Sequence, residues 1–252
     1  YYFEKDGRFF FASELQAFFH LDEFDPNDVN ELAIAQYFRY GFIPGPNTAY
    51  KNVFSLGAGR TLLKTSGNSE HRSYWKPSVS GEMRNPDFKE IEELIDESVR
   101  LRLRSDVPLG AFLSGGIDSG LITASMSRQL DKPVSTFTIS TDKNSWQDES
   151  EAAKLTASHL KTFHREIKVE PDFVGVTEKL ARHYGQPLAD HSSVLTYYVS
   201  RETRKYVKVA LTGDGGDELF GGYGSYLNLP LYQLLGGIPY PFKKFLAGIL
   251  RH

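Results

Sequence analysis

The sequence predicts an α/β fold built on a doubly wound, mostly parallel sheet. Over residues 85–252, short apolar runs typical of strands alternate with longer segments whose apolar residues recur at helical spacing. Two of the apolar runs end in loops rich in glycine and acidic residues. In a parallel sheet the loops that follow different strands meet at one edge, which is where ligands bind.

The first of these loops follows a strand predicted over 107–113 and leads into a predicted helix. It carries Gly115 and Gly116, which let backbone N–H groups surround an anion, and the helix N-terminus adds partial positive charge. The usual nucleotide P-loop ends in Lys followed by Ser or Thr, whereas this loop has Asp118 and Ser119. Because a carboxylate repels phosphate unless a divalent cation lies between them, Asp118 predicts magnesium. An ordinary strand-to-helix turn is the structural alternative.

The second loop follows the apolar run 207–211, within the stretch VKVALTGDGGDELFGGY. It carries Asp214 and Asp217, then Glu218 and a further Gly-Gly pair. If both loops follow parallel strands, their acidic residues would share one crevice at the carboxyl ends of the strands.

The motif SGGIDS, ending at Ser119, and the motif TGDGGDELFGGY, ending at Tyr223, together resemble the synthetase domain of glutamine-dependent asparagine synthetases. That family belongs to the PP-loop ATP pyrophosphatase superfamily, so the resemblance implies a fold of the adenine nucleotide alpha hydrolase type. The resemblance extends from about Pro86 to Tyr223. Either motif alone would also fit related enzymes that make GMP, NAD or argininosuccinate.

The resemblance implies ATP and Mg2+ as cofactors and assigns a role to each motif residue. The residues it implies for the nucleotide and pyrophosphate are Phe112, Ser114, Gly115, Gly116, Asp118, Ser119, Ile139, Thr212 and Gly213. The backbone at Phe112 and Ile139 would form the adenine slot. Asp118 and Asp217 would hold magnesium, and Asp214 would be the catalytic residue facing the acyl adenylate and the incoming ammonia.

The implied reaction is ATP-dependent amide formation by a carbon–nitrogen ligase. AMP is transferred to the side-chain carboxylate of aspartate, pyrophosphate leaves, and ammonia attacks the acyl-AMP. The best-known asparagine synthetases have Glu-Gly-Ser where this chain has Asp214-Gly215-Gly216, so a related amidotransferase that acts on another carboxylate is the alternative. An incomplete Mg-ATP-binding module without turnover is the second hypothesis. A tRNA-thiolating enzyme is disfavoured by the lack of cysteine and of a basic surface.

Composition sets further limits on the function. The 252 residues carry a net charge of −3, which gives no electrostatic reason to expect binding of nucleic acid. The chain contains no cysteine, which excludes disulfides and thiolate zinc sites. The uncharged apolar runs are too short to span a bilayer, and the first residues do not have the basic-then-apolar pattern of a signal segment, so we expect none. We therefore expect a cytoplasmic protein that acts on small molecules and does not bind a membrane.

The resemblance divides the chain into three segments. Residues 1–20 look like the C-terminal remnant of a class II glutaminase domain, 21–84 like an interdomain bridge, and 85–252 like an ATP-binding synthetase domain that is incomplete at its C-terminus. The glutaminase nucleophile of the family is an N-terminal cysteine, which this chain lacks. We expect a chain truncated at both ends, with ammonia coming from glutamine only in the intact enzyme, which could be a homodimer.

The remaining elements follow from periodicity and capping signals. A hairpin turns at Asp6-Gly7, and Ser13 is the expected N-cap of a short helix to Phe19. The other predicted elements are helices over 27–39, 87–104, 120–130, 151–160, 173–184 and 194–206, and strands over 133–140 and 162–169. Asp148 and Glu149 are interpreted as a helix-start cluster in preference to a metal site, and Arg100, Arg102 and Arg104 as a solvated helix end in preference to a phosphate site.

Overall fold

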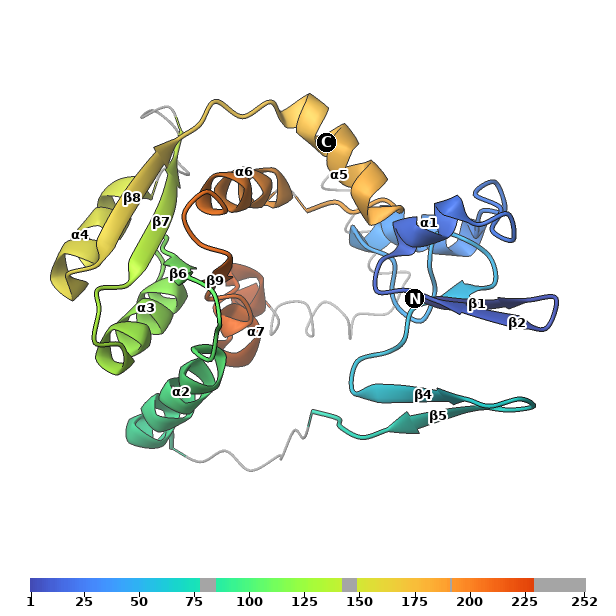
Figure 1. Cartoon of the computed structure of the whole chain (residues 1–252), viewed down its shortest axis with the longest axis horizontal. Helices are drawn as coiled ribbons and strands as arrows, with labels where there is room; N and C mark the ends of the chain where they lie inside the picture. Colours follow the sequence, from blue (N-terminus) through green and yellow to red (C-terminus); the bar gives the residue numbers. More distant parts are fainter. Residues whose placement is uncertain (78–84, 142–148, 191, 229–252) are drawn as a thin grey trace, which may run out of the picture. The chain divides into compact units, whose positions relative to one another are not determined.

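The computed structural model describes residues 1–77, 85–141, 149–190 and 192–228. Contacts between Cα atoms divide the chain into two compact units (Figure 1). The first comprises Tyr1–Phe88 and Val169–Glu202, and the second comprises Lys89–Lys168 and Thr203–His252. The boundaries expected at residues 20 and 84 stay a prediction, and the segment from 229 onward lies outside the described residues.

The described part of the second unit is built on a four-stranded parallel sheet with the order β8-β7-β6-β9. Its strands are β6 (Leu109–Phe112), β7 (Ser135–Ser140), β8 (Phe163–Lys168) and β9 (Val209–Leu211). The chain moves outward from β6 to β8 and then returns to place β9 on the other side of β6. This reversal of strand order defines a doubly wound sheet, which confirms the predicted fold class.

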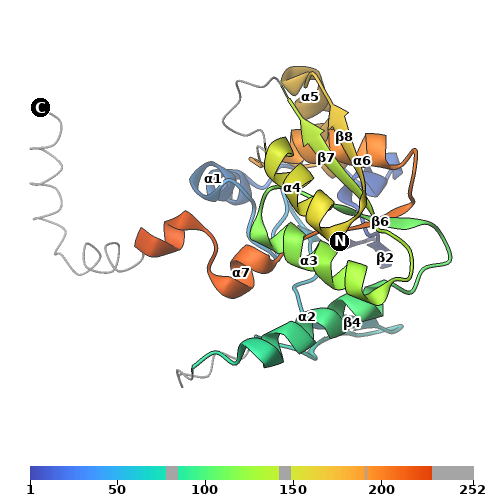
Figure 2. The ribbon, with the colours of Figure 1, turned by 90° about the vertical axis from the view of Figure 1, so that its left-hand side faces the viewer.

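Helices α3 (Ile117–Gln129) and α4 (Ser150–Leu160) cover the same face of this sheet (Figure 2). Helix α2 (Phe88–Arg102) precedes β6 and adds Val99 to the core. The fully or almost fully buried members of this core are Val99, Ala111, Met126, Val134 and Leu211. Their burial removes apolar surface from water and fixes α2 and α3 against the strands that carry the two loops.

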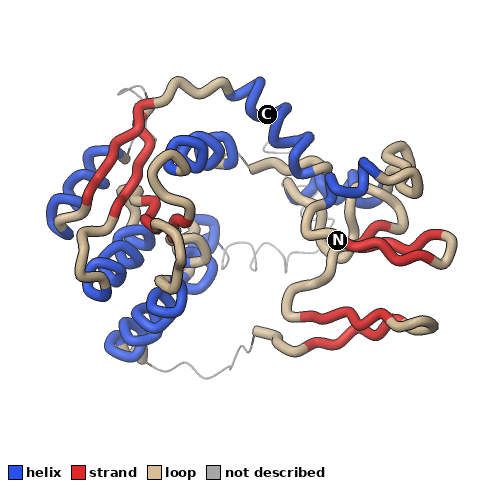
Figure 3. The backbone as a smooth tube through the Cα atoms, viewed as in Figure 1, coloured by secondary structure: helices blue, strands red, loops and turns tan. Residues whose placement is uncertain are grey.

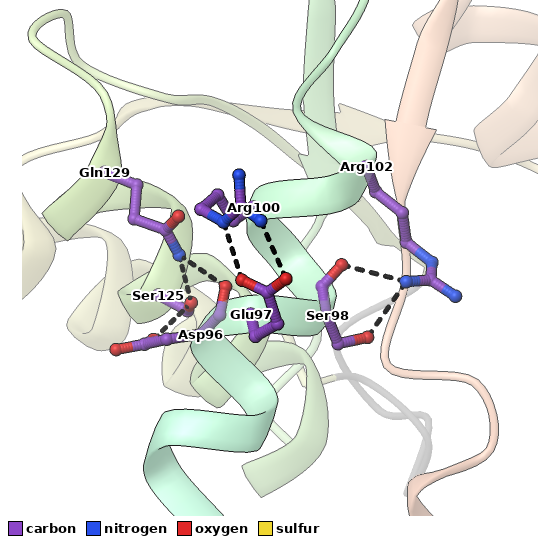
Figure 4. A network of polar contacts seen from close by, with 7 residues as sticks. All are labelled: Asp96, Glu97, Ser98, Arg100, Arg102, Ser125 and Gln129. Carbon is purple, nitrogen blue, oxygen red and sulfur yellow. Dashed lines mark hydrogen bonds and ion pairs between the residues drawn. The ribbon is translucent and has the colours of Figure 1, made fainter.

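A polar network joins α2 to α3 beside this core (Figure 4). Ser125 Oγ donates to Asp96 Oδ1 at 2.5 Å, and Gln129 Nε2 donates to the Asp96 carbonyl at 3.0 Å. Arg128 Nη2 lies 2.7 Å from the same Asp96 oxygen. The network gives α3, which begins at the first glycine loop, a fixed position on α2.

The first unit has an antiparallel sheet of β1 (Tyr2–Lys5), β2 (Arg8–Phe11) and β3 (Val53–Phe54), and a separate hairpin of β4 (Arg60–Lys64) and β5 (Ser69–Ser73), drawn in red in Figure 3. Its core contains Phe3, Leu15, Phe18, Phe24 and Val53. The helical elements of this unit are η1 (Leu15–His20), α1 (Glu31–Tyr40), α5 (Phe173–Tyr184) and α6 (Ser193–Thr203). The predicted first hairpin is confirmed, with Asp6 and Gly7 in the left-handed region.

Several predicted boundaries are wrong in the N-terminal segment. Glu14, not Ser13, stands at the N-cap of η1 and makes no side-chain cap, and η1 is a 3-10 helix. Helix α1 begins at Glu31, four residues later than expected, because Asn30 accepts a hydrogen bond from the Ala33 amide and so provides the cap.

Two differences affect the glycine loops. Helix α3 begins at Ile117 instead of residue 120, which places Asp118 and Ser119 in its first turn. The second motif contains a short helix, α7 (Gly216–Phe220), followed by η2 (Gly224–Asn228), where only a loop was expected. None of the helices in the described residues is long and apolar enough to cross a membrane.

Candidate nucleotide site

Both glycine loops leave the same edge of the sheet from neighbouring strands. Strands β6 and β9 pair in parallel, with Ala111 opposite Leu211, so their carboxyl ends lie side by side. The first loop, 113–116, leads from β6 into α3, and the second, 212–215, leads from β9 into α7. The sequence predicted this meeting of the two loops at the reversal point of the strand order, and the register of β6 and β9 confirms it.

The first loop is held in shape by its two serines. Ser114 N donates to Ser119 Oγ at 3.1 Å, and the two hydroxyl oxygens lie 2.9 Å apart. Ser114 Oγ also accepts the Gly116 amide at 3.1 Å. Gly116 is the N-cap of α3 and offers no side-chain cap to the first-turn amides, which favours binding of an anion there.

The second loop is organised by Thr212 and Gly215. Thr212 Oγ1 donates to Asp214 Oδ2 at 2.9 Å, so the hydroxyl orients this carboxylate. Gly215 has φ +96°, a conformation that an L side chain rarely adopts, and it serves as the N-cap of α7. Asp214 is exposed and Asp217 is half-buried in the first turn of α7.

The two loops pack directly on each other through glycine. A Cβ atom on Gly213 would lie 2.7 Å from the Ser119 amide nitrogen and 2.8 Å from Asp118 Cβ. A Cβ atom on Gly216 would lie 2.5 Å from Asp118 Cγ. The half-buried Asp118 carboxylate therefore rests against the residue that immediately precedes Asp217.

The acidic residues of the two loops are the candidate ligands for a magnesium ion. Within residues 1–77, 85–141, 149–190 and 192–228, no group of three or more His, Cys, Asp or Glu side chains could hold a metal. Magnesium is usually held by one or two carboxylates, with substrate phosphates and water completing the octahedron. Asp118 and Asp217 supply two carboxylates of this chemistry: the Asp118 carboxylate lies against Gly216, and the Asp217 carboxylate lies against Gly222 in the turn after α7.

The backbone segments expected at the adenine slot also lie at this edge. Phe112 is the last residue of β6 and pairs with Phe137 of β7, while Leu113 N donates to the Phe137 carbonyl at 2.8 Å. Ile139 follows two residues later, near the carboxyl end of β7. Strands β6 and β7 thus bring both backbone segments to one end of the sheet.

Glu149 is a member of the site that the sequence reasoning did not place there. The Gly115 amide donates to Glu149 Oε2 at 2.9 Å, and the Glu149 side chain makes no cap on α4. A signal was available, because Glu149 follows β7, and the carboxyl end of β7 lies at the same edge as that of β6. Asp148 lies outside the described residues.

A second contact that the sequence reasoning did not predict joins Tyr223, the last residue of the acidic motif, to Glu218. Tyr223 Oη donates to Glu218 Oε1 at 2.7 Å. This bond lowers the pKa of the Glu218 carboxyl and raises the pKa of Tyr223 to about 12. The Gly222 amide also donates to the Asp217 carbonyl, so the turn after α7 is tied back to its beginning.

Other residues singled out in the sequence lie elsewhere. Arg100 pairs with Glu97 at 2.6 Å, and Arg102 donates to the carbonyl of Ser98, all within α2 (Figure 4). Helix α2 leads to the amino end of β6, the edge opposite the loops, which fits the expectation of a solvated helix end for these two arginines.

Comparison with known proteins identifies the family. The family model described as asparagine synthase matches residues 90–244, which is more than half of the chain and includes both glycine loops. The chain belongs to the asparagine synthase family. Residues 1–75 of this asparagine synthase family member match a second model, described as a glutamine amidotransferase domain.

Two relatives align along 99% of this asparagine synthase family chain. The Methanocaldococcus jannaschii protein named "Putative asparagine synthetase (glutamine-hydrolyzing) 2" is 36% identical, and asparagine synthetase (glutamine-hydrolyzing) 1 of Bacillus subtilis is 31% identical. The chain spans 51% and 39% of their respective lengths. Among solved structures, an NH3-dependent NAD synthetase from Campylobacter jejuni aligns with 18% identity and a TM-score of 0.38 over 55% of this chain and 62% of that chain.

Proposed function

We propose that this chain provides the nucleotide-binding and adenylating part of an ATP-dependent ligase that converts the side-chain carboxylate of aspartate to an amide. The contact of Asp118 with Gly213 and Gly216 carries the proposal, because it joins a phosphate-type loop to an acidic loop at one edge of the sheet. Membership of the asparagine synthase family supports the reaction class.

The first loop has the donors to hold the pyrophosphate part of ATP. We assign this role to Ser114, Gly115, Gly116 and Ser119, together with the uncapped amides in the first turn of α3. The serine hydroxyls that shape the loop sit at its base, so the amides stay in position as charge builds on the departing pyrophosphate. Donors fixed before the reaction stabilise that charge without reorganising.

Magnesium is assigned to Asp118 and Asp217. When bound, the ion neutralises charge on the phosphates and on the leaving pyrophosphate. Thr212 and Gly213 contact the nucleotide from the second loop. The backbone at Phe112 and Ile139 receives the adenine, where N–H and C=O groups at strand ends serve as donors and acceptors.

The chemistry takes two displacement steps. An oxygen of the aspartate carboxylate attacks the α-phosphorus, the bond to the bridging oxygen breaks, and pyrophosphate leaves. Ammonia then attacks the acyl carbon, and the bond from this carbon to the oxygen it shares with phosphorus breaks. AMP leaves with that former carboxylate oxygen, and the nitrogen loses a proton. Asp214, whose carboxylate is oriented by the Thr212 hydroxyl, accepts that proton.

Ammonia is the nitrogen source to supply to this chain, because it contains no cysteine to serve as a glutaminase nucleophile. Aspartate is the favoured acceptor, and another carboxylate remains the alternative at the Asp214-Gly215-Gly216 motif. We place the protein in the cytoplasm, and a homodimer stays a prediction.

Aspartate-dependent exchange of labelled pyrophosphate into ATP tests adenylation directly. The 252-residue chain should catalyse exchange with Mg2+ present, and Asp118→Asn should abolish it, while Asp131→Asn, an exposed acid after α3, should leave it unchanged. Binding of Mg-ATP without exchange for any carboxylate would favour a nucleotide-binding module without turnover. We retain the nucleotide-binding module as the second candidate because the chain spans only 51% and 39% of the lengths of these two relatives.

A further inference from the structure

We infer that Glu149 is an internal anion that occupies a phosphate position of the first loop until the nucleotide replaces it. The inference rests on the proposed function of the loop. Its basis is the 2.9 Å hydrogen bond from the Gly115 amide to Glu149 Oε2. The carboxylate therefore takes a donor that the loop would otherwise offer to a phosphate oxygen.

The position of Glu149 is fixed by close packing between α4 and the loop. A Cβ atom on Gly115 would lie 2.8 Å from Ala152 Cβ and 3.1 Å from Glu149 Cβ. Only glycine allows this approach, because any other residue at 115 would force α4 away. The lack of a side chain at Gly115 thus allows the Glu149 carboxylate to approach the loop amide.

The Glu149 side chain does not perform the ordinary task of an acid at a helix start. It stands at the N-cap of α4, where a carboxylate commonly accepts an amide of the first turn, yet it makes no such bond. Its hydrogen bond to Gly115 joins the connection that follows β7 to the loop that follows β6. The neighbouring Gly116 amide is bonded to the neutral hydroxyl of Ser114, so the two loop amides have partners of different charge.

A phosphate oxygen and the Glu149 carboxylate cannot share the Gly115 amide at short range. Glu149 and Gly115 are both exposed, so water screens the site, but two like charges within hydrogen-bonding distance of one donor still repel each other. Binding of the nucleotide must therefore move Glu149 away, which weakens binding of every anion. Only an anion that gains much from magnesium and the helix N-terminus overcomes that cost, so Glu149 favours a metal-bound polyphosphate over weakly charged anions.

Glu149→Gln separates the charge from the hydrogen bond, because the amide oxygen can still accept from Gly115. Glu151→Gln is the matched control, since Glu151 lies in the first turn of the same helix and pairs with Lys154 at 3.4 Å. The dissociation constant of inorganic pyrophosphate is measured by calorimetry with and without Mg2+. We expect Glu149→Gln to bind roughly threefold to tenfold more tightly in both conditions, and Glu151→Gln to change much less.

Unchanged affinity in Glu149→Gln overturns the inference while leaving the proposed function intact. Weaker binding only with Mg2+ would make Glu149 a metal ligand, which also overturns it. Failure of the unaltered chain to bind pyrophosphate at all would overturn the inference and the phosphate site of the proposed function together.

A measurement on the unaltered chain answers the same question if Glu149→Gln does not fold. Pyrophosphate should shift both the Gly115 amide resonance and the Glu149 side-chain carboxyl carbon resonance, because the amide exchanges the carboxylate for a phosphate acceptor. A Glu149 carboxyl resonance that stays in place when pyrophosphate binds contradicts displacement.

Discussion

Ser125 Oγ on α3 donates a 2.5 Å hydrogen bond to Asp96 Oδ1 on α2 (Figure 4). Ser125 is completely buried, and Arg128 approaches the same carboxylate oxygen. The bond from Ser125, followed by that from Arg128, holds the pKa of Asp96 below its ordinary value. The position of α3 therefore depends on the ionised form of Asp96, because this form accepts the hydrogen bond from Ser125.

Ser125→Ala should destabilise the fold by about 1.5–3 kcal/mol near neutral pH, because a hydrogen bond to a charged group is lost. A lowered folded-state pKa gives stability that is present above the ordinary aspartate pKa and is lost as pH falls through the folded pKa. The deficit of the variant should therefore shrink in acid. Urea unfolding at neutral and acid pH measures it.

Ser127→Ala is the control for that experiment, because Ser127 Oγ donates to the neutral Thr123 carbonyl on the same helix. Its deficit should not depend on pH over the same range. A Ser125→Ala deficit that stays constant into acid would show that the Asp96 charge does not contribute.

Gly213→Ala should disrupt the contact between the loops. The added methyl group would meet the backbone of Asp118 and Ser119, which cannot move without shifting α3. We expect a loss of about 1–3 kcal/mol in unfolding free energy, typical of overpacking, together with weaker Mg-ATP binding. Gly224→Ala, with nothing within 4 Å, should change neither the melting temperature nor the dissociation constant.

Tyr223→Phe should remove a tyrosine transition centred at about 12 from the alkaline titration. Because the folded pKa of Tyr223 is raised, its bond to Glu218 stabilises the fold below the ordinary tyrosine range and is lost as pH rises toward about 12. The difference in tyrosinate absorbance between the two proteins isolates this residue. A difference spectrum that titrates at the ordinary tyrosine pKa would contradict the hydrogen bond.

Met126→Ala should cost about 2–5 kcal/mol, because Met126 is fully buried between α3 and the strands. Leu155→Ala on α4 is the matched control, since its side chain is 74% exposed and its loss should cost less than about 0.5 kcal/mol. Chemical unfolding of both variants tests whether the core lies under α3, as the structure has it.

The sequence predicted the parallel sheet and the meeting of its two glycine loops, because both follow from local patterns and the rule for strand ends. It missed the early start of α3 at Ile117, where Gly116 takes an extended N-cap conformation that no periodicity reveals. It placed Glu149 correctly at the start of a helix but missed its hydrogen bond to Gly115, which depends on how two strand-end connections pack. The place of Glu149 after β7 indicates the correct edge of the sheet, but the hydrogen bond itself is set by tertiary packing.

The place of β9 beside β6 has a consequence for biosynthesis. Ala111 emerges from the ribosome long before Leu211, its partner in the sheet, and pairing across such a separation is slow to form. The loop 113–116 is therefore synthesised well before the acidic loop 212–215 that packs on it. On the proposed function, a nascent chain that stops before β9, the last strand of the described residues, lacks the loop that carries the assigned magnesium ligand Asp217.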